Sequence, residues 1–329
     1  MRVLIVTNMY PTPEKPAAGT FVKEQVDSLV KEGVEVDVLC VDGSRHKLAY
    51  LWGIFRLWGK LLRRRYDLIH AHYVFSGIIA RAQFLCPVVL THHGLEVFTG
   101  WQRYPSRYIT PLVDRVILVS DEQKRALNRP DAHIIPCGIN LDLFQPVPKN
   151  EARRQLGLPL DKKLVMWVGN PLRPEKQYDI VLKAVALAKR EDPDIELALV
   201  EGQSHDRIPL YMSAGDVLLL VSRAEGSPVV VHEAMACNLP VVSVPVGDVA
   251  SVIGDTEGCY LCTHDPEDVA RKLLLATATP ARTEGREKIK YMEEKLTARR
   301  IINVYQELVE DKVSGYRRKK ACQLARRKL

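Results

Sequence analysis

Two carboxylates bracket a short turn in the second half of the chain. Glu225 and Glu233 lie eight positions apart, and the preceding stretch Asp216 to Val221 is apolar after its first residue, which predicts a buried strand. Ser227 suits a helix N-cap and Pro228 the first helical turn, so we expect Glu225 in a loop and Glu233 inside a helix. A helix start presents unpaired N–H groups and a positive dipole end to an anion. The spacing therefore predicts a phosphate cradle with a carboxylate on each side to bind hydroxyls, as a nucleotide sugar requires.

The same segment resembles the signature of the retaining glycosyltransferases of family 4 (glycosyl transferases group 1). In that signature a Glu, seven intervening residues and a second Glu precede Ala-Met-Ala, and here Ala234 to Ala236 follow Glu233. The resemblance implies that Glu225 is catalytic and faces the hydroxyls of the donor sugar, while Glu233 faces the ribose. It also implies that the backbone between them faces the diphosphate, through Gly226, Ser227, Pro228 and Val229.

The resemblance covers most of the chain, from Met1 to about Leu308. It implies an α/β protein of GT-B fold, in which two Rossmann-like, doubly wound parallel-sheet domains face each other across a cleft. It further implies a nucleotide-diphosphate sugar as donor substrate, a metal-independent reaction and no cofactor. We expect an N-terminal acceptor-side domain over 1–145, a C-terminal donor-binding domain over 146–308 and a basic tail over 309–329.

The order of strands and helices supports this organisation. Apolar strands alternate with helical stretches, which predicts parallel sheets covered by helices. We expect strands at 2–7, 35–41, 68–70, 88–91, 116–120, 164–169, 195–202, 216–221 and 241–244, and helices at 19–33 and 178–189. Ligands in such folds bind at the carboxyl ends of the strands. Asp192 and Asp194 lie at the other end of their strand, so we interpret this Asp-x-Asp as a turn and not as a metal site.

A glycine follows the first expected strand. The segment Pro16 to Val22 resembles the glycine loop of the family, which contacts donor phosphate and acceptor, so Gly19 is a donor-binding candidate. Glycine permits a close backbone approach, and a helix start again favours an anion. A turn glycine without a ligand is the alternative. The pattern is not Gly-x-Gly-x-x-Gly, so it gives no support for nicotinamide or flavin binding.

A histidine pair follows another expected strand, in the segment Thr91 to Glu96. The family has a histidine here whose carbonyl or ring meets the donor sugar near the reacting carbon, and alignment on Gly94 makes His93 that catalytic residue. A structural histidine in a tight turn is one alternative. A zinc site is another, because His70, His72 and His92 also follow neighbouring strands. We favour the donor role and expect no metal.

A third loop, from Val168 to Lys176, resembles the strand-to-helix loop of the family, in which an arginine and a lysine clamp the diphosphate. Lys176 matches that lysine, whereas Asn170 stands at the usual arginine position and Arg173 is the candidate substitute. Cations suit this place because negative charge develops on the diphosphate as the sugar leaves. The segment 201–209 follows the next strand and should flank the nucleobase, but its side chains do not identify the base.

The composition is that of an ordinary globular protein. The 329 residues are 47% hydrophobic and 26% charged, enough for two cores, with 7 scattered cysteines that favour a reducing compartment. We interpret the pair Cys259 and Cys262 as buried small residues rather than as a zinc or redox site. No secretory signal or long apolar run is present, so we expect a cytoplasmic protein.

The net charge of +7 is unevenly distributed. Residues 312–329 hold eight Lys or Arg and no acid, so 39 of the 47 cations lie elsewhere, against 40 acids. A second basic segment, 47–65, has Leu51, Ile54, Phe55, Trp58, Leu61 and Leu62 at helical spacing. These two segments favour peripheral contact with an anionic membrane on its inner face. A core-facing helix with a solvated basic side is the alternative, and no nucleic-acid partner is expected.

These features together predict a retaining transfer of sugar from a nucleotide diphosphate to an acceptor hydroxyl. No carboxylate stands out as a covalent nucleophile, which favours a front-face route assisted by the leaving phosphate. A lipid-linked acceptor or a cell-envelope glycan is consistent with the basic segments. The alternatives are a nucleotide-sugar epimerase of the same fold and a non-catalytic nucleotide-sugar-binding protein or membrane scaffold.

Overall fold

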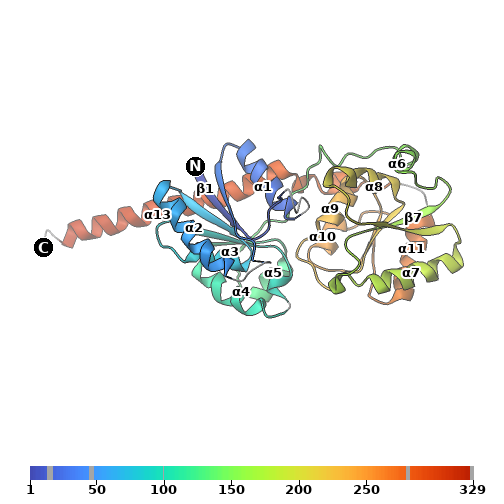
Figure 1. Ribbon diagram of the computed structural model, residues 1–329, viewed down its shortest axis with the longest axis horizontal. Helices are drawn as coiled ribbons and strands as arrows, with labels where there is room; N and C mark the ends of the chain where they lie inside the picture. Colours follow the sequence, from blue (N-terminus) through green and yellow to red (C-terminus); the bar gives the residue numbers. More distant parts are fainter. Residues whose placement is uncertain (13–17, 44–47, 99, 279–281, 327–329) are drawn as a thin grey trace. The chain divides into compact units, whose positions relative to one another are not determined.

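The computed structural model describes residues 1–12, 18–43, 48–98, 100–278 and 282–326 (Figure 1). The chain falls into two compact units. The first comprises Met1–Leu118, Lys124–Ile135 and Lys295–Leu329, and the second comprises Val119–Gln123 and Pro136–Glu294. No described helix is both long enough and apolar enough to cross a bilayer.

The first unit is built on a parallel sheet of six strands in the order β2-β1-β3-β4-β5-β6. Its strands are β1 (Arg2–Thr7), β2 (Glu35–Cys40), β3 (Leu68–His72), β4 (Val88–His92), β5 (Arg115–Leu118) and β6 (His133–Ile134). Its helices are α1 (Thr20–Lys31), α2 (Ala49–Arg63), α3 (Val74–Arg81), α4 (Arg103–Ile109), α5 (Asp121–Leu127) and α13 (Glu294–Arg326), with 3-10 turns η1 (Leu95–Val97) and η2 (Thr110–Leu112).

Both faces of this sheet are covered, because successive side chains of a strand point to opposite faces. Leu4 and Val6 of β1 pack with α2 and α3, whereas Val3 and Ile5 pack with α1 and α13. Figure 1 shows α2 and α3 on one side of the sheet and α1 with α13 on the other. This continuous burial explains the unbroken apolar run of β1.

The C-terminal helix α13 belongs to the first unit, so the domain limits differ from those expected. We expected residues up to 308 in the second domain, but 295 onward group with the first unit. The physical reason is the apolar face of α13, which packs under the first sheet through Ala298, Ile301, Val304, Tyr305 and Leu308. The expected tail from 309 continues the same helix to Arg326.

The second unit has a parallel sheet of five strands in the order β11-β10-β9-β7-β8. The strands are β7 (Lys163–Val168), β8 (Ile195–Val200), β9 (Val217–Leu220), β10 (Val241–Ser243) and β11 (Tyr260–Leu261). The helices are α6 (Lys149–Leu156), α7 (Tyr178–Glu191), α8 (Ile208–Ala214), α9 (Val229–Ala236), α10 (Val249–Ile253), α11 (Pro266–Ala278) and α12 (Gly285–Lys288). Short 3-10 turns are η3 (Pro174–Lys176), η4 (His205–Arg207) and η5 (Lys290–Met292).

Each sheet has a point where the strand order reverses, between β1 and β3 and between β7 and β9. Loops that leave the carboxyl ends of strands at such a point diverge and leave room for a ligand. The loops after β7 and β9 carry Lys176 and Glu225, and the loop after β1 carries Gly19. The fold therefore places these expected site residues at ligand-binding edges of their own sheets.

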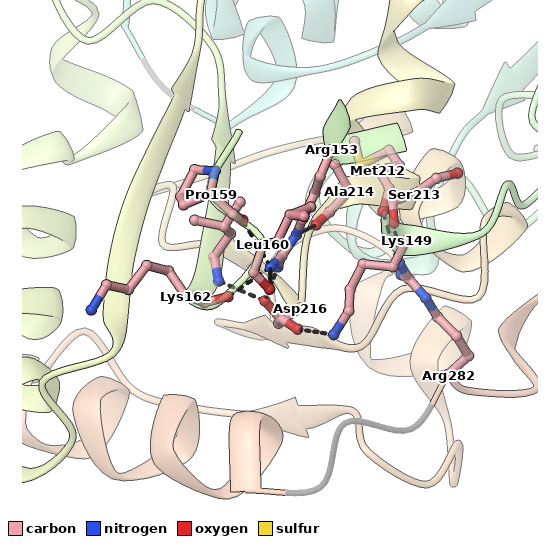
Figure 2. A network of polar contacts seen from close by, with 11 residues as sticks. Lys149, Arg153, Pro159, Leu160, Lys162, Met212, Ser213, Ala214, Asp216 and Arg282 are labelled. Atoms are coloured by element: carbon pink, nitrogen blue, oxygen red, sulfur yellow. Dashed lines mark hydrogen bonds and ion pairs between the residues drawn. The ribbon is translucent and has the colours of Figure 1, made fainter. Parts of the chain in front are cut away.

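The opposite edge of the second sheet is held by a buried ion network (Figure 2). Arg153 is only 1% exposed and pairs with Asp216 at 2.6 Å, and Lys149 pairs with the same carboxylate at 2.8 Å. The guanidinium also donates to the carbonyls of Pro159, Leu160, Lys162 and Ala214. Asp216 in turn accepts the N–H of Leu164 at 2.6 Å. The starts of β7 and β9 are thus tied together, which fixes the strands that carry the loops of the other edge.

Two further groups of polar residues lie next to strands of the second sheet, outside the site. Asp192 and Asp194 flank a turn and pair with Lys163 and Lys162, at 2.7 and 2.9 Å. Cys259 and Cys262 are free thiols on either side of the short strand β11, the first half-buried and the second buried. Burial raises the pKa of Cys259 to about 11 and that of Cys262 to about 12, so both stay protonated at neutral pH.

Candidate active site

The ion pair between Lys176 and Glu225 is the centre of the candidate site in the second unit. Lys176 Nζ lies 2.7 Å from Glu225 Oε1, and each side chain is 19% exposed. The backbone holds the two loops together, because the Arg223 N–H donates to the Glu175 carbonyl at 2.8 Å. The cation and the carboxylate therefore neutralise each other across two adjacent loops.

The helix that follows Glu225 begins one residue later than expected. Pro228 is the N-cap of α9 and Val229 its first residue, so the prediction of Ser227 as N-cap and Pro228 in the first turn was wrong. The hydroxyl of Ser227 donates to Asp248 Oδ2 at 2.5 Å, and His232 Nε2 lies 3.4 Å from the same oxygen. Asp248, in the loop after β10, thus binds the serine hydroxyl that was expected to cap the helix. The local sequence around Ser227 does not reveal this contact.

No side chain caps the amino end of α9 among the residues that the structure describes. The first N–H groups of a helix have no intrahelical partner, and the dipole favours an anion there. The segment from Gly226 to Val229 leads into this helix start. A helix start of this kind is suited to an anion.

Glu233 lies in α9, as expected, and is almost fully buried. Its Oε1 is 2.8 Å from Nε2 of His205, which comes from η4 after β8. The pair joins the loop after β8 to the helix after β9. The segment 201–209 was expected to flank the nucleobase, but the contact of His205 was not predictable, because nothing local links it to a carboxylate 28 positions away.

Arg173 lies apart from this pair. Its side chain is 61% exposed, and its nearest acidic partner is Glu175, at 3.9 Å. It stands at the N-cap of η3, whereas Lys176 ends the same turn. The structure therefore brings the side chain of Lys176 to Glu225, whereas the side chain of Arg173 pairs with neither and only its backbone carbonyl accepts the Lys176 N–H, at 3.0 Å.

A glycine that the sequence reasoning missed supports the loop of Glu225. Gly247, after β10, has a φ of 60°, and a Cβ added there would lie 2.4 Å from the carbonyl oxygen of Gly226. Any side chain would displace the Glu225–Gly226 backbone or strain its own. The signal in the sequence is only a glycine between two strands, which is common in loops.

Gly19 is required by the backbone of the first unit. It caps α1 with a φ of 69°, and an added Cβ would lie 2.6 Å from both the carbonyl carbon and oxygen of Met9. The close approach that we expected for a donor is therefore made, in this structure, to the protein's own chain. Part of the expected glycine loop, residues 16 and 17, lies outside the described residues.

His93 lies in the first unit, just after β4, and its ring is buried. Its Nε2 is 2.8 Å from Nδ1 of His72, and the two rings stack with centroids 5.1 Å apart. Its backbone N–H donates to Glu96 at 2.9 Å. While the bond to His72 is in place, Nε2 of His93 is not available to a donor sugar.

The histidines form a buried layer with Tyr305 of α13. His70 Nδ1 lies 2.6 Å from the hydroxyl of Tyr305, and its Nε2 lies 2.6 Å from Thr91 Oγ1. Burial lowers the pKa of His72 to about 3. Burial, with neighbouring histidines, also lowers the pKa of His70 and of His93 well below the ordinary value. All three rings are neutral at pH 7 and bind their neighbours as neutral donors and acceptors.

The zinc alternative finds no geometric support in the part of the chain that the structure describes, where no group of three His, Cys, Asp or Glu is arranged to hold a metal ion. The nitrogens that face one another in His72 and His93 are 2.8 Å apart, which is hydrogen-bond distance. Two nitrogens bound to the same tetrahedral zinc would lie about 3.3 Å apart, since each Zn–N bond is about 2.0 Å long.

Comparison with known families identifies both halves of the chain. Residues 18–143 match the family model described as Glycosyltransferase Family 4, and residues 199–278 match the one described as Glycosyl transferases group 1. The first match spans Gly19 and His93, and the second spans Glu225 and Glu233. Lys176 lies between the two.

Relatives carry the same type of activity in their names. TuaC of Bacillus subtilis, named for glycosyl transfer in teichuronic acid biosynthesis, is 26% identical over 327 residues, which covers 77% of this chain and 83% of TuaC. The D-inositol 3-phosphate glycosyltransferase of Nocardiopsis dassonvillei is 24% identical over 294 residues, which covers 72% of this chain and 68% of that protein.

Solved structures show the same fold. Sucrose-phosphate synthase from Thermosynechococcus elongatus matches with a TM-score of 0.80 and 22% identity over 94% of this chain and 100% of its own. HepE from Anabaena, solved in complex with UDP-glucose, matches with a TM-score of 0.70 and 17% identity over 95% of this chain and 100% of its own. With two parallel Rossmann-like sheets and both family models matched in order, the chain belongs to the family 4 glycosyltransferases of glycosyl transferases group 1 and is a glycosyltransferase of GT-B fold.

Proposed function

We propose that this glycosyltransferase moves a sugar from a nucleotide diphosphate to an acceptor hydroxyl with retention of the anomeric configuration and without a metal ion or cofactor. The observation that carries the proposal is the Lys176–Glu225 ion pair beside the uncapped start of α9. A cation, a set of backbone N–H groups and a carboxylate in one place are what a sugar diphosphate needs.

Each residue then has a role that follows from its chemistry. When the donor binds, Lys176 pairs with the diphosphate in place of Glu225, and the diphosphate lies against the segment Gly226 to Val229. The exposed side chain of Arg173 also contacts the diphosphate. Glu225 turns to the hydroxyls of the sugar. Glu233, on the second turn of α9, binds the ribose. His93 acts through its backbone carbonyl, because its ring Nε2 is bound to His72.

The reaction follows a front-face course. The acceptor oxygen attacks the anomeric carbon on the side from which the diphosphate leaves, and the bonding electron pair of the broken C–O bond goes to the phosphate oxygen. The acceptor proton passes to that same phosphate. Lys176 and the α9 N–H groups stabilise the charge that develops there. Glu225, engaged with a cation and then with hydroxyls, serves as a binding group and not as a nucleophile.

The acceptor is proposed to be a lipid-linked sugar or a cell-envelope glycan at the inner face of a membrane. Support comes from TuaC, whose name places it in teichuronic acid biosynthesis, and from the basic amphipathic helix α2. HepE, crystallised with UDP-glucose, supports a nucleotide sugar as the donor class.

Donor binding tests the proposal directly. In a thermal-shift panel of UDP-, GDP- and ADP-sugars with EDTA present, one nucleotide class should raise the melting temperature, since a ligand at 100 times its Kd adds about 2.7 kcal/mol to the native state. NMR of the product should then show the anomeric configuration of the donor. An inverted product, loss of transfer in EDTA, or release of an epimerised donor with no glycosylated acceptor would each overturn it.

A further inference from the structure

Helix α2 has two apolar faces, and only one of them is used by the fold. Gly53 and Leu57 are buried, and Ile54 and Leu61 pack against the core of the first unit. The opposite face is also apolar and lies in solvent, with Leu48, Leu51, Trp52, Phe55 and Leu62 at helical spacing. Trp52 is 68% exposed, Phe55 69% and Leu62 80%. The stripe expected from the sequence mixed residues of both faces.

A rigid turn adds two more exposed apolar residues beside this helix. Phe84 and Leu85, between α3 and β4, are 82% and 56% exposed. The buried side chain of Gln83 fixes their backbone, since its Oε1 accepts the N–H groups of Leu85 and Cys86 at 2.6 and 2.8 Å. Its Nε2 donates to the carbonyls of Ala80 and Cys86 at 3.1 and 2.9 Å. The turn thus holds two large apolar side chains largely in solvent.

Trp58 joins the turn to the helix. Its ring lies 5.9 Å from that of Phe84 in an edge-on arrangement, and its Nε1 donates to the Ala82 carbonyl at 3.2 Å. We call the outer face of α2 together with Phe84 and Leu85 the apolar platform. Contiguous exposed apolar surface of this kind marks an interaction site.

Cations flank the apolar platform along the side of α2 that faces β2. Arg56 donates to the carbonyl of Cys40 at 3.1 Å, and Arg64 lies 3.3 Å from Asp37. Lys60 and Arg63 follow on the same flank at helical spacing. The sequence has no acid from 43 to 66 or from 68 to 95, so α2 and the turn of Phe84 contribute cations and no carboxylate to this surface.

We infer that the apolar platform docks this protein on the surface of an anionic lipid bilayer. Trp and Phe insert at the boundary of headgroups and acyl chains, while Lys60 and Arg63 contact the acidic headgroups. An acidic protein partner would pair with the cations but would not require exposed indole and phenyl rings beside them. A bilayer interface accommodates both the rings and the cations. The biological role of this docking rests on the proposed function. The membrane would be the partner that brings a lipid-linked acceptor to the enzyme.

Vesicle flotation of the full chain tests this docking. The wild type should float with vesicles that contain about one third phosphatidylglycerol and bind neutral phosphatidylcholine vesicles far more weakly. The variant W52S/F55S should lose at least about tenfold in affinity. The variant K60Q/R63Q should lose about 25-fold in affinity for anionic vesicles and little for neutral ones, because each cation near an anionic surface contributes about fivefold. The matched control V30S/L182S replaces two half-exposed apolar residues on α1 and α7 and should bind as the wild type does.

Three results would overturn the inference. They are no flotation of the wild type, equal flotation of W52S/F55S, or a concentration-dependent dimer without lipid that W52S/F55S abolishes, which would assign the surface to a second copy. Donor binding in solution separates this test from that of the proposed function. Thermal shifts by the sugar nucleotide should be the same in W52S/F55S and the wild type. A failure of donor binding therefore leaves the flotation result intact, and a failure of flotation leaves the donor-binding result intact.

Discussion

Lys176 and Glu225 form an ion pair with each other, so the roles proposed for them can be tested one at a time. We expect Lys176→Met to lower kcat by about 100-fold or more, because it removes a cation from the leaving phosphate. Glu225→Gln should lower turnover by a similar factor and leave Lys176 without its partner. Steady-state kinetics with the donor class found by thermal shift provides the measurement.

The control for this pair is Lys189→Met, which removes an exposed lysine that lies 3.9 Å from Glu196. Its turnover and stability should stay within about 0.5 kcal/mol of the wild type. Circular dichroism should show that the Lys176 and Glu225 variants remain folded. Transfer close to the wild-type rate in both site variants would refute the assignment.

Single residues were predictable from the sequence where their role depends on the position along a strand or helix. Lys176, Glu225 and Glu233 lie in the loops and the helix expected for them. Residues whose role depends on a partner from another loop were not predictable. Asp248 takes the hydroxyl of Ser227 across 21 positions, and His205 pairs with Glu233 across 28. Such contacts exist only once the sheet has brought the loops together.

At the scale of elements, the loop after β10 supports the loop after β9 through Gly247. We expect Gly247→Ala to destabilise the protein more than Gly157→Ala. Both positions have a positive φ, near 60° and 68°, but an added Cβ at Gly157 meets nothing within 4 Å. The left-handed backbone alone costs about 1 kcal/mol for alanine, and the contact with Gly226 should add about 1–3 kcal/mol.

Urea unfolding of the two glycine variants measures this difference, and donor-induced thermal shifts measure its effect on the site. Gly247→Ala should bind the donor more weakly because it displaces the backbone next to Glu225. Gly157→Ala should bind the donor normally. Equal losses of unfolding free energy in both variants would show that the backbone angle, and not the close approach, sets the cost.

The strands were the elements best predicted, because buried parallel strands are short apolar runs with turns on both sides. The expected strand 2–7 is found as Arg2–Thr7, and 241–244 as Val241–Ser243. Helix α2 was predicted as an element, but its apolar stripe was assigned wrongly. In a helix that is apolar on two faces, the spacing of apolar residues does not distinguish the two. Only the packing of the folded chain shows which face is exposed to solvent.

At the scale of the whole molecule, the alternation of strands and helices predicted two doubly wound units but not the path of the chain between them. The last helix returns to the first unit, where Tyr305 reaches His70 at 2.6 Å. Nothing local distinguishes a helix that packs on its own domain from one that packs on the other, because both require the same amphipathic pattern. The division of the chain depends on that choice.

The buried histidines of the first unit make its stability depend on pH. In the unfolded chain a histidine has a pKa of about 6.5, whereas burial lowers the pKa of His72 to about 3 and those of His70 and His93 well below normal. The stabilisation is therefore complete above about pH 6.5 and is lost as the pH falls toward the folded pKa, since only the unfolded state binds the protons. At pH 5, His72 alone should cost about 2 kcal/mol relative to pH 7.

Urea unfolding between pH 7 and pH 5 isolates this effect, because ordinary carboxylates titrate near pH 4. The free energy of unfolding should fall steadily below pH 6.5, with each buried histidine contributing up to about 1.4 kcal/mol per pH unit. In His72→Gln the total stability should drop at every pH, since His93 loses its partner, but the slope should be shallower by the share of one histidine. The pH dependence of the free energy of unfolding reports whether the buried imidazole resists protonation. Its value at a single pH also includes the packing contribution of the side chain. An unchanged slope in His72→Gln would mean that His72 takes up its proton in the folded state as readily as in the unfolded chain.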